Sequence, residues 1–118
     1  MKTNEAAFPW MQLNLRREFH VAKVAILSGN EPIMNLEVRV GKEPVDESNK
    51  GSQRLDSNTR CGIFHGPTLV SKQWLEIDCG YTKGIKGNRV TIQLLERKMM
   101  NNPLEISSVE VFGWAPAC

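Results

Sequence analysis

The amino-acid sequence predicts an all-β fold, an antiparallel β-sandwich or barrel. Several short segments alternate between apolar and polar residues, as half-buried strands do. Clusters of Gly, Pro, Asn and Ser separate these segments, and no segment repeats its apolar residues with the period of a helix. Short strands that follow one another without helices between them are typical of antiparallel sandwiches and barrels.

Two strands are predicted in the first quarter of the chain. In residues 8–15 apolar and polar side chains alternate, and Pro9 is tolerated because it stands where the strand begins. The apolar run VAKVAIL, residues 21–27, is compatible with a second, buried strand. The residues that follow it, 28–32, form a turn cluster.

The third strand is predicted at residues 36–40, where the alternation is cleanest, and it stops at Gly41. Residues 42–60 are rich in Ser, Asn, Lys and Glu and contain only Val45 and Leu55 as apolar anchors. This composition predicts a long surface loop.

Two further strands are predicted at residues 73–79 and 88–94, with three glycines in the connection between them. In the first of these strands Cys79 shares the inward face with the aliphatic residues, and Trp74 lies on the polar face. In the second strand Thr91 and Gln93 are predicted to face outward.

A last strand is predicted at residues 104–112. The apolar positions change parity within it, between Ile106 and Val109. A change of parity within one strand indicates a β-bulge, which we expect near Ser107 and Ser108.

Three cysteines constrain the covalent structure. Cys61 and Cys79 are eighteen positions apart, and a bridge between them would contribute roughly 3 kcal/mol of stability. Spacing alone leaves this pairing open, and if it forms, Cys118 stays free or bonds to another molecule. Together with His65 the two cysteines offer only three zinc ligands, in a spacing that fits no structural zinc pattern. We therefore expect no metal site there.

Size and charge limit the function classes. The 118 residues suffice for one domain, predicted to span 1–118 with its core in residues 8–114. The net charge of +2 is small and scattered, so nucleic acid is not an expected partner. No run is long enough to span a membrane, and MKTNEAAFPW lacks the apolar core of a signal peptide. No nucleophile, acid–base pair or metal set converges in the pattern, so an enzyme is not predicted.

Several motifs together resemble a known family. In order and spacing, PWMQLNL, VAKVAIL, LEVRVG, WLEIDCG, GNRVTIQL and LEISSVEVFGW are similar to the F-type lectin domain, also called the fucolectin/tachylectin-4/pentraxin-1 domain. The resemblance implies an eight-stranded jelly roll related to discoidin domains, an extracellular location and L-fucose binding at one end of the sandwich. It also implies a structural calcium ion and a disulfide between Cys61 and Cys79.

The residues that bind fucose in that family are not retained here. The family uses one His, which would precede residue 1, and two Arg from the interval that reads SGNEPIMN in this chain. The first Arg aligns with Ser28 or Gly29, the neighbouring Asp with Asn30 or Glu31, and the second Arg falls near Asn35. A charged hydrogen bond contributes about 1.5–3 kcal/mol, so the loss of both arginines predicts loss of this mode of fucose recognition.

We therefore expect any sugar contact to come from Asn30, Glu31, Asn35 and Trp74. A carbohydrate-binding module with altered or lost fucose specificity is the first hypothesis, with fucosylated or other glycans as partners. A domain that binds a cell-surface protein or lipid head groups through the same loops is the alternative. Trp74 could stack on a sugar or a partner, or lie beneath a covering loop.

The resemblance also bears on metal binding and on completeness. The family's calcium ligands come from an upstream loop, which would precede residue 1, and from a Cys-Glu pair that is Ser107 and Ser108 here. Calcium requires six to eight oxygen ligands, so no calcium site is expected from this chain alone. The family's first strands would also precede residue 1. We expect an incomplete domain with an unpaired strand edge through which molecules can associate.

Overall fold

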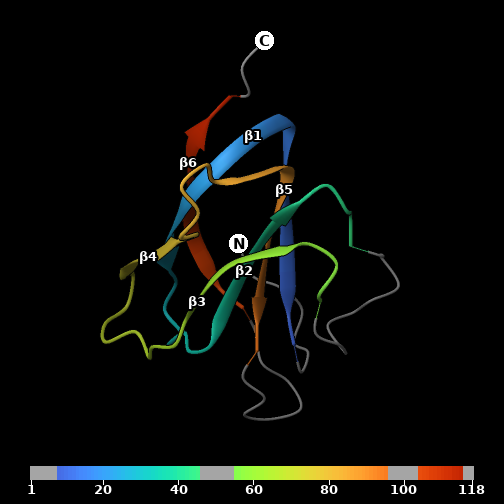
Figure 1. Ribbon diagram of the computed structural model, residues 1–118. Coiled ribbons are helices and arrows are strands. Elements are labelled where there is room, and N and C mark those ends of the chain that lie inside the picture. The colour runs from blue at the N-terminus through green and yellow to red at the C-terminus, as the bar shows by residue number, and fades with distance from the viewer. Residues whose placement is uncertain (1–7, 46–54, 96–103, 116–118) are drawn as a thin grey trace.

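The computed structural model describes residues 8–45, 55–95 and 104–115, and in these ranges it contains six β-strands and no helix (Figure 1). The strands are β1 Trp10–Ser28, β2 Leu36–Gly41, β3 Thr59–Phe64, β4 Trp74–Asp78, β5 Ile85–Leu94 and β6 Ile106–Trp114. All pairings between them are antiparallel. The predicted all-β sandwich is confirmed. Cys118 and the middle of the predicted 42–60 loop lie outside the described residues.

The strand β1 belongs to both layers of the sandwich. Its first half pairs with β5, which continues through β2 to β3 and forms the first layer. Its second half lies between β4 and β6 and forms the second layer. Figure 1 shows β1 rising on one side and turning over the top of the molecule. The prediction of separate strands at 8–15 and 21–27 is therefore wrong, because the chain stays extended between them.

The turn in β1 has a local cause. Between Asn14 and Phe19 the register with β5 shifts, so several β1 residues have no partner on β5. Arg16 adopts φ +71°, and its N–H donates to the side-chain oxygen of Asn14 at 2.8 Å. On β5, a Cβ added at Gly87 would lie 2.6 Å from a backbone oxygen of β2, so only glycine fits where the strands approach at this corner.

The core lies between the layers. Fully buried aliphatic side chains of β1 face those of β2 and β5, and they include Val24, Ile26, Leu36, Val38, Val40, Val90 and Ile92. The disulfide between Cys61 of β3 and Cys79 after β4 is present, so the pairing implied by the resemblance is confirmed. It joins an edge of the first layer to an edge of the second and closes that side of the sandwich.

The structure changes some details of the predicted strands and confirms another. The strand β3 lies partly in the predicted surface loop and was not foreseen, and β5 begins at Ile85, three residues earlier than predicted. The bulge in the last strand is confirmed, because Leu27 pairs with Ser108 and Ser28 pairs with Ile106, which leaves Ser107 as the extra residue. No helix in the described ranges is long and apolar enough to cross a bilayer.

Candidate functional site

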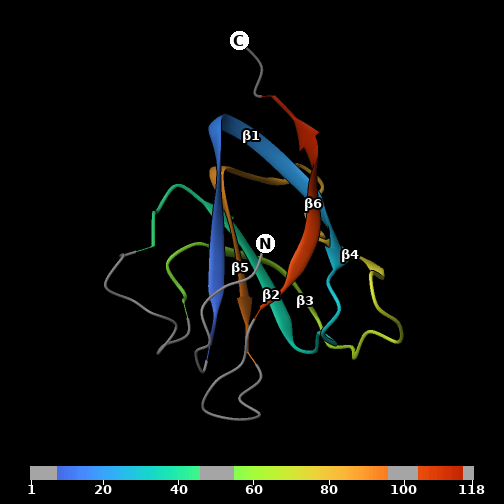
Figure 2. The same cartoon turned by 180° about the vertical axis from the view of Figure 1, so that it is seen from behind.

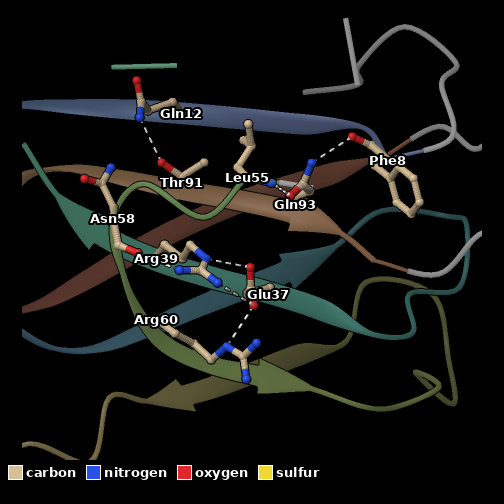
Figure 3. A network of polar contacts seen from close by, with 9 residues as sticks. All are labelled: Phe8, Gln12, Glu37, Arg39, Leu55, Asn58, Arg60, Thr91 and Gln93. Carbon is tan, nitrogen blue, oxygen red and sulfur yellow. Dashed lines mark hydrogen bonds and ion pairs between the residues drawn. The ribbon is translucent and has the colours of Figure 1, made fainter. Parts of the chain in front are cut away.

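A polar layer covers the outer face of the first sheet (Figure 3). The carboxylate of Glu37 on β2 is 2 % exposed and accepts hydrogen bonds at 2.8 Å from the Nε atoms of Arg39 and Arg60. Arg39 also donates from Nη1 to the backbone oxygen of Asn58 at 2.6 Å. These arginines therefore neutralise a buried acid and hold the chain that leads into β3.

Amide side chains extend this layer toward β1. Gln12 donates to the hydroxyl of Thr91 at 2.8 Å and accepts from the backbone N–H of Val45 at 3.2 Å. Gln93 accepts from the backbone N–H of Leu55 at 2.8 Å and donates to the backbone oxygen of Phe8 at 3.1 Å. Thr91 and Gln93 were predicted to face outward, and they do, but they are only 4 % and 2 % exposed. The backbone segments that bind them cover them.

The candidate binding site lies at the other end of the sandwich from the turn in β1. There the β1–β2 connection, residues 29–35, meets the β3–β4 connection, residues 65–73 (Figure 1). The two connections enclose an open hollow of ≈ 190 Å³. Its lining residues are Asn30, Pro32, Thr68, Leu69, Val70 and Ser71.

Backbone hydrogen bonds fix the two connections to each other. The N–H of Ser28 donates to the oxygen of Gln73 at 2.9 Å, and the N–H of Gln73 donates to the Ser28 hydroxyl at 2.9 Å. Thr68 and Ile33 exchange two bonds of 3.0 Å, one through the Thr68 hydroxyl. Glu105, just before β6, accepts from the N–H of Asn30 at 2.9 Å. The hollow is therefore held in shape before any ligand binds.

One rim of the hollow is apolar and unusually exposed. The side-chain oxygen of Gln73 accepts from the backbone N–H groups of Leu69, at 2.6 Å, and Val70, at 3.3 Å. This holds the backbone of the loop while the two side chains are 84 % and 65 % exposed. Polar Asn30 and Ser71 lie in the same lining, so the hollow offers both hydrogen-bonding groups and apolar surface.

The residues predicted to contact a sugar are only partly brought together. Asn30 lines the hollow, and Glu31 is exposed next to it in the chain. Trp74 begins β4 at the same end and is 48 % exposed, so about half of this residue is accessible to a ligand.

Asn35 is not among the residues that line the hollow, and its backbone is hydrogen-bonded to neighbouring segments. Its N–H donates to the oxygen of His65 at 3.1 Å, its own oxygen accepts from Leu95 at 2.8 Å, and its φ is +52°.

Besides Pro32, the lining residues that were not predicted from the sequence are Thr68, Leu69, Val70 and Ser71. They lie in the GPTLVS segment, about forty positions after Asn30, and no local pattern joins the two segments. The one feature of the sequence that pointed to this segment was Leu69 and Val70, two adjacent apolar residues in an otherwise turn-like loop.

The described part of the chain offers little to a metal ion. No group of three His, Cys, Asp or Glu side chains there could hold a metal ion. Ser107 and Ser108 provide no carboxylate and belong to no such group, so these residues do not fit the calcium ion that the resemblance implies. Near the turn in β1, hydrogen bonds from Lys42 and Lys86 lower the pKa of Glu18.

Comparison with known proteins supports the fold assignment. No family model matches the chain, and no curated protein matches it. Among solved structures, the fucose-binding module SpX-3 of Streptococcus pneumoniae is similar with a TM-score of 0.59 and 23 % identity, over 96 % of this chain and 71 % of that one. The lectin domain of lectinolysin, solved with Lewis B antigen, is similar with a TM-score of 0.62 and 24 % identity, over 97 % and 71 %.

These neighbours confirm the predicted F-type-lectin-like fold. The two neighbours are described as a fucose-binding module and a lectin domain, and neither description names an enzyme. At this level of identity the likeness concerns the fold.

Proposed function

We propose that this chain is a carbohydrate-binding module, and that a glycan binds in the hollow between residues 29–35 and 65–73. The observation that carries the proposal is this preformed hollow at one end of a fold shared with a fucose-binding module and a lectin domain. The disulfide between Cys61 and Cys79 supports an extracellular location, because disulfides persist in oxidising compartments.

The lining suits a sugar. A monosaccharide has hydroxyl groups that need a few hydrogen-bonding partners and apolar C–H faces that pack on apolar side chains. Asn30 and Ser71 offer the polar groups, and Leu69 and Val70 offer the apolar surface. Trp74, half-exposed at the same end of the sandwich, provides an aromatic ring within the same surface region.

We further propose that the specificity differs from that of fucose-binding relatives. Neither segment that forms the hollow contains an arginine. Arg39 and Arg60, on β2 and β3, are engaged with Glu37 on the outer face of the first sheet. Because the residues that line the hollow are all uncharged, recognition inside it would depend on neutral hydrogen bonds, each of which contributes about 0.5–1.5 kcal/mol, and single-site affinity should be weak.

A glycan-array screen of the oxidised protein, run with calcium and again with EDTA, tests the proposal. We expect binding in both conditions. Asn30→Ala and Ser71→Ala should each weaken binding of the best glycan about 3- to 10-fold, as the loss of one hydrogen bond predicts. Ser57→Ala is the matched control, because Ser57 is exposed on the loop that precedes β3. A folded protein that binds no glycan would refute the proposal.

A second candidate is a domain that binds a lipid surface, which the exposure of Leu69 and Val70 favours. Two neighbouring apolar side chains at a loop tip can enter the boundary between head groups and acyl chains. Sedimentation with phosphatidylserine vesicles separates the candidates. Loss of vesicle binding in Leu69→Ser/Val70→Ser, together with silence on the array, would favour lipid over sugar.

A further inference from the structure

Positive charge gathers around the turn in β1. The net charge of +2 is scattered along the sequence, but the fold brings five cationic side chains to this end of the sandwich. Figure 2 shows the turn at the top of the molecule, with the end of β2 and the start of β5 below it. We call these side chains the corner cluster, and they are Arg16, Arg17, Lys42, Lys86 and Arg89.

The three arginines of the corner cluster form no ion pair with any described residue. Arg16 and Arg17 are exposed on the turn itself, and the guanidinium of Arg17 lies 5.4 Å from the centre of the Phe19 ring. Arg89 pairs with Asn14 across β1 and β5, and its buried Nε atom has no hydrogen-bond partner. No carboxylate in direct contact balances these charges, so the three guanidinium groups remain able to bind an anion.

The two lysines of the corner cluster share one carboxylate. Glu18 pairs with the Nζ atoms of Lys42 at 2.9 Å and Lys86 at 3.2 Å, and these lysine side chains are still 65 % and 53 % exposed. A single carboxylate balances only one of the two ammonium charges. Five cations and this one carboxylate leave the corner with a net charge of +4. Such a concentration of one sign of charge attracts a partner of the opposite sign.

The arrangement of the corner cluster suits a ligand with several charges in a row. Its members come from β1, from β5 and from the residue after β2, and all except Arg89 are exposed. A chain that carries anionic groups at successive positions can contact more of these cations than one small anion can. The planar guanidinium group can donate two parallel hydrogen bonds to a tetrahedral oxyanion. The ligand chemistry that fits is therefore a polyanion with sulfate or phosphate groups.

The position of the corner cluster favours one source of such a polyanion. A bilayer with acidic lipids would engage the exposed apolar pair Leu69 and Val70, but this pair lies at the opposite end of the sandwich. The disulfide supports an extracellular location, whereas nucleic acids are held inside cells. Sulfated polysaccharides are extracellular polyanions, so they conflict with neither observation.

We propose that a sulfated polysaccharide binds the corner cluster, at a site separate from the hollow. Arg16 and Arg17 donate to its sulfate groups, and Lys42 and Lys86 add positive charge beside them. Glu18 holds the two lysines in place but also repels the ligand. The site contains no residue that lines the hollow, so its test does not depend on whether a glycan binds there.

Surface plasmon resonance on immobilised heparin tests the proposal with the oxidised protein. Wild type should bind at low salt and dissociate at an ionic strength of about 1 M, where charges more than about 3 Å apart are screened. Arg16→Gln/Arg17→Gln should raise the Kd about 2- to 30-fold, as the loss of two exposed charge contacts predicts. Glu18→Gln should instead lower the Kd, because it removes the negative charge and releases Lys42 and Lys86.

Two matched controls make the same changes of charge away from the turn. Arg60→Gln/Lys72→Gln removes two positive charges from β3 and from the opposite end of the sandwich, and Glu110→Gln removes one exposed carboxylate from β6. Both controls should bind heparin like wild type, and circular dichroism establishes that every variant is folded.

The proposal is overturned if folded wild type does not bind heparin at low salt, or if the cluster variants bind like their controls. Binding to fully desulfated heparin with the same affinity would show that sulfate is not recognised, and would overturn it as well. Polythymidylate is the last competitor. If it displaced the protein from heparin equally well at equal charge, the site would be a general polyanion site and not one for a sulfated polysaccharide.

Discussion

At the scale of single residues, Glu37 is a buried carboxylate whose charge is balanced by two arginines of different exposure. Arg39 is 17 % exposed and also binds the backbone oxygen of Asn58, whereas Arg60 is 48 % exposed. Removing one partner of a buried ion pair is costly, because it leaves a charge without compensation. The two arginines should therefore contribute unequally to stability.

We predict that Arg39→Met lowers the free energy of unfolding by about 3 kcal/mol. Arg60→Met, the matched control, should lower it by less than about 1 kcal/mol, since water can reach the exposed side of this pair. Urea denaturation of both variants measures the difference. Equal effects of the two substitutions would show that Arg39 and Arg60 contribute equally to balancing the charge of Glu37.

Glu18 gives the fold a pH dependence at the turn of β1. Hydrogen bonds from Lys42 and Lys86 lower its pKa in the folded state below the ordinary value of 4.5. The ionised carboxylate therefore favours the folded state at pH above 4.5, and this contribution is lost as the pH falls through the lowered value. Salt should weaken the effect, because these groups are at the surface.

We expect Glu18→Gln to be less stable than wild type at neutral pH and equally stable at a pH below the folded-state pKa. Thermal denaturation across the acid range, at low and high salt, measures this difference. Lys42→Met should reproduce part of the loss, since Lys42 provides the largest contribution to the lowered pKa. A difference between Glu18→Gln and wild type that persists in acid would contradict the assignment.

Period-two alternation predicted the direction of side chains but not their environment. Thr91 and Gln93 point outward as predicted, yet both are buried, because the segments at Val45 and Leu55 cross over them. Glu37 of β2 is also buried, and its carboxylate contacts the side chains of Arg39 and Arg60. Which face of a strand is covered depends on segments distant in sequence, and alternation contains no information on those segments.

At the scale of elements, the disulfide joins two edge strands that no backbone ladder connects. Cys61 lies on β3 and Cys79 follows β4, eighteen positions later. Reducing it, or replacing both cysteines by serine, should lower the free energy of unfolding by roughly 3 kcal/mol. Denaturation of the oxidised protein with and without reductant measures this, and the double serine variant should be insensitive to reductant. A reductant-independent wild type would contradict the prediction.

Elements with strong local patterns were predicted, and elements defined by tertiary pairing were not. The alternation in β2 and β4 and the parity change in β6 identified these strands and the bulge. β3 was missed, because TRCGIF contains glycine and two polar residues and becomes a strand through its pairing with β2. The hollow between residues 29–35 and 65–73 was not predicted as a unit, because Asn30 lay in the segment implied by the resemblance whereas Ser71 meets it only in the fold.

At the scale of the whole molecule, β1 couples the two layers. One continuous strand pairs with β5 in the first layer and with β4 and β6 in the second. If β1 separates from its partners in one layer, the part of β1 that belongs to the other layer is disturbed as well. The core between them is also shared, since Ile26 of the second layer and Ile92 of the first belong to one cluster of buried side chains.

We therefore predict a single cooperative unfolding transition. Ile26→Ala and Ile92→Ala remove fully buried side chains from opposite layers, and each should lower the free energy of unfolding by about 2–5 kcal/mol. The tryptophans report on the layers separately, because Trp10 pairs with β5 whereas Trp74 begins β4. Trp74→Phe/Trp114→Phe keeps Trp10 as the only reporter, and Trp10→Phe/Trp114→Phe keeps Trp74.

In guanidinium, the fluorescence transitions of the two reporters should coincide with each other and with far-ultraviolet circular dichroism. Either core substitution should move both reporters to the same lower midpoint, because a defect in one layer is transmitted through β1 and the shared core. If Ile26→Ala moved the Trp74 midpoint and left the Trp10 midpoint in place, the layers would be separate folding units. The turn in β1 would then be a flexible connection and not a structural coupling between them.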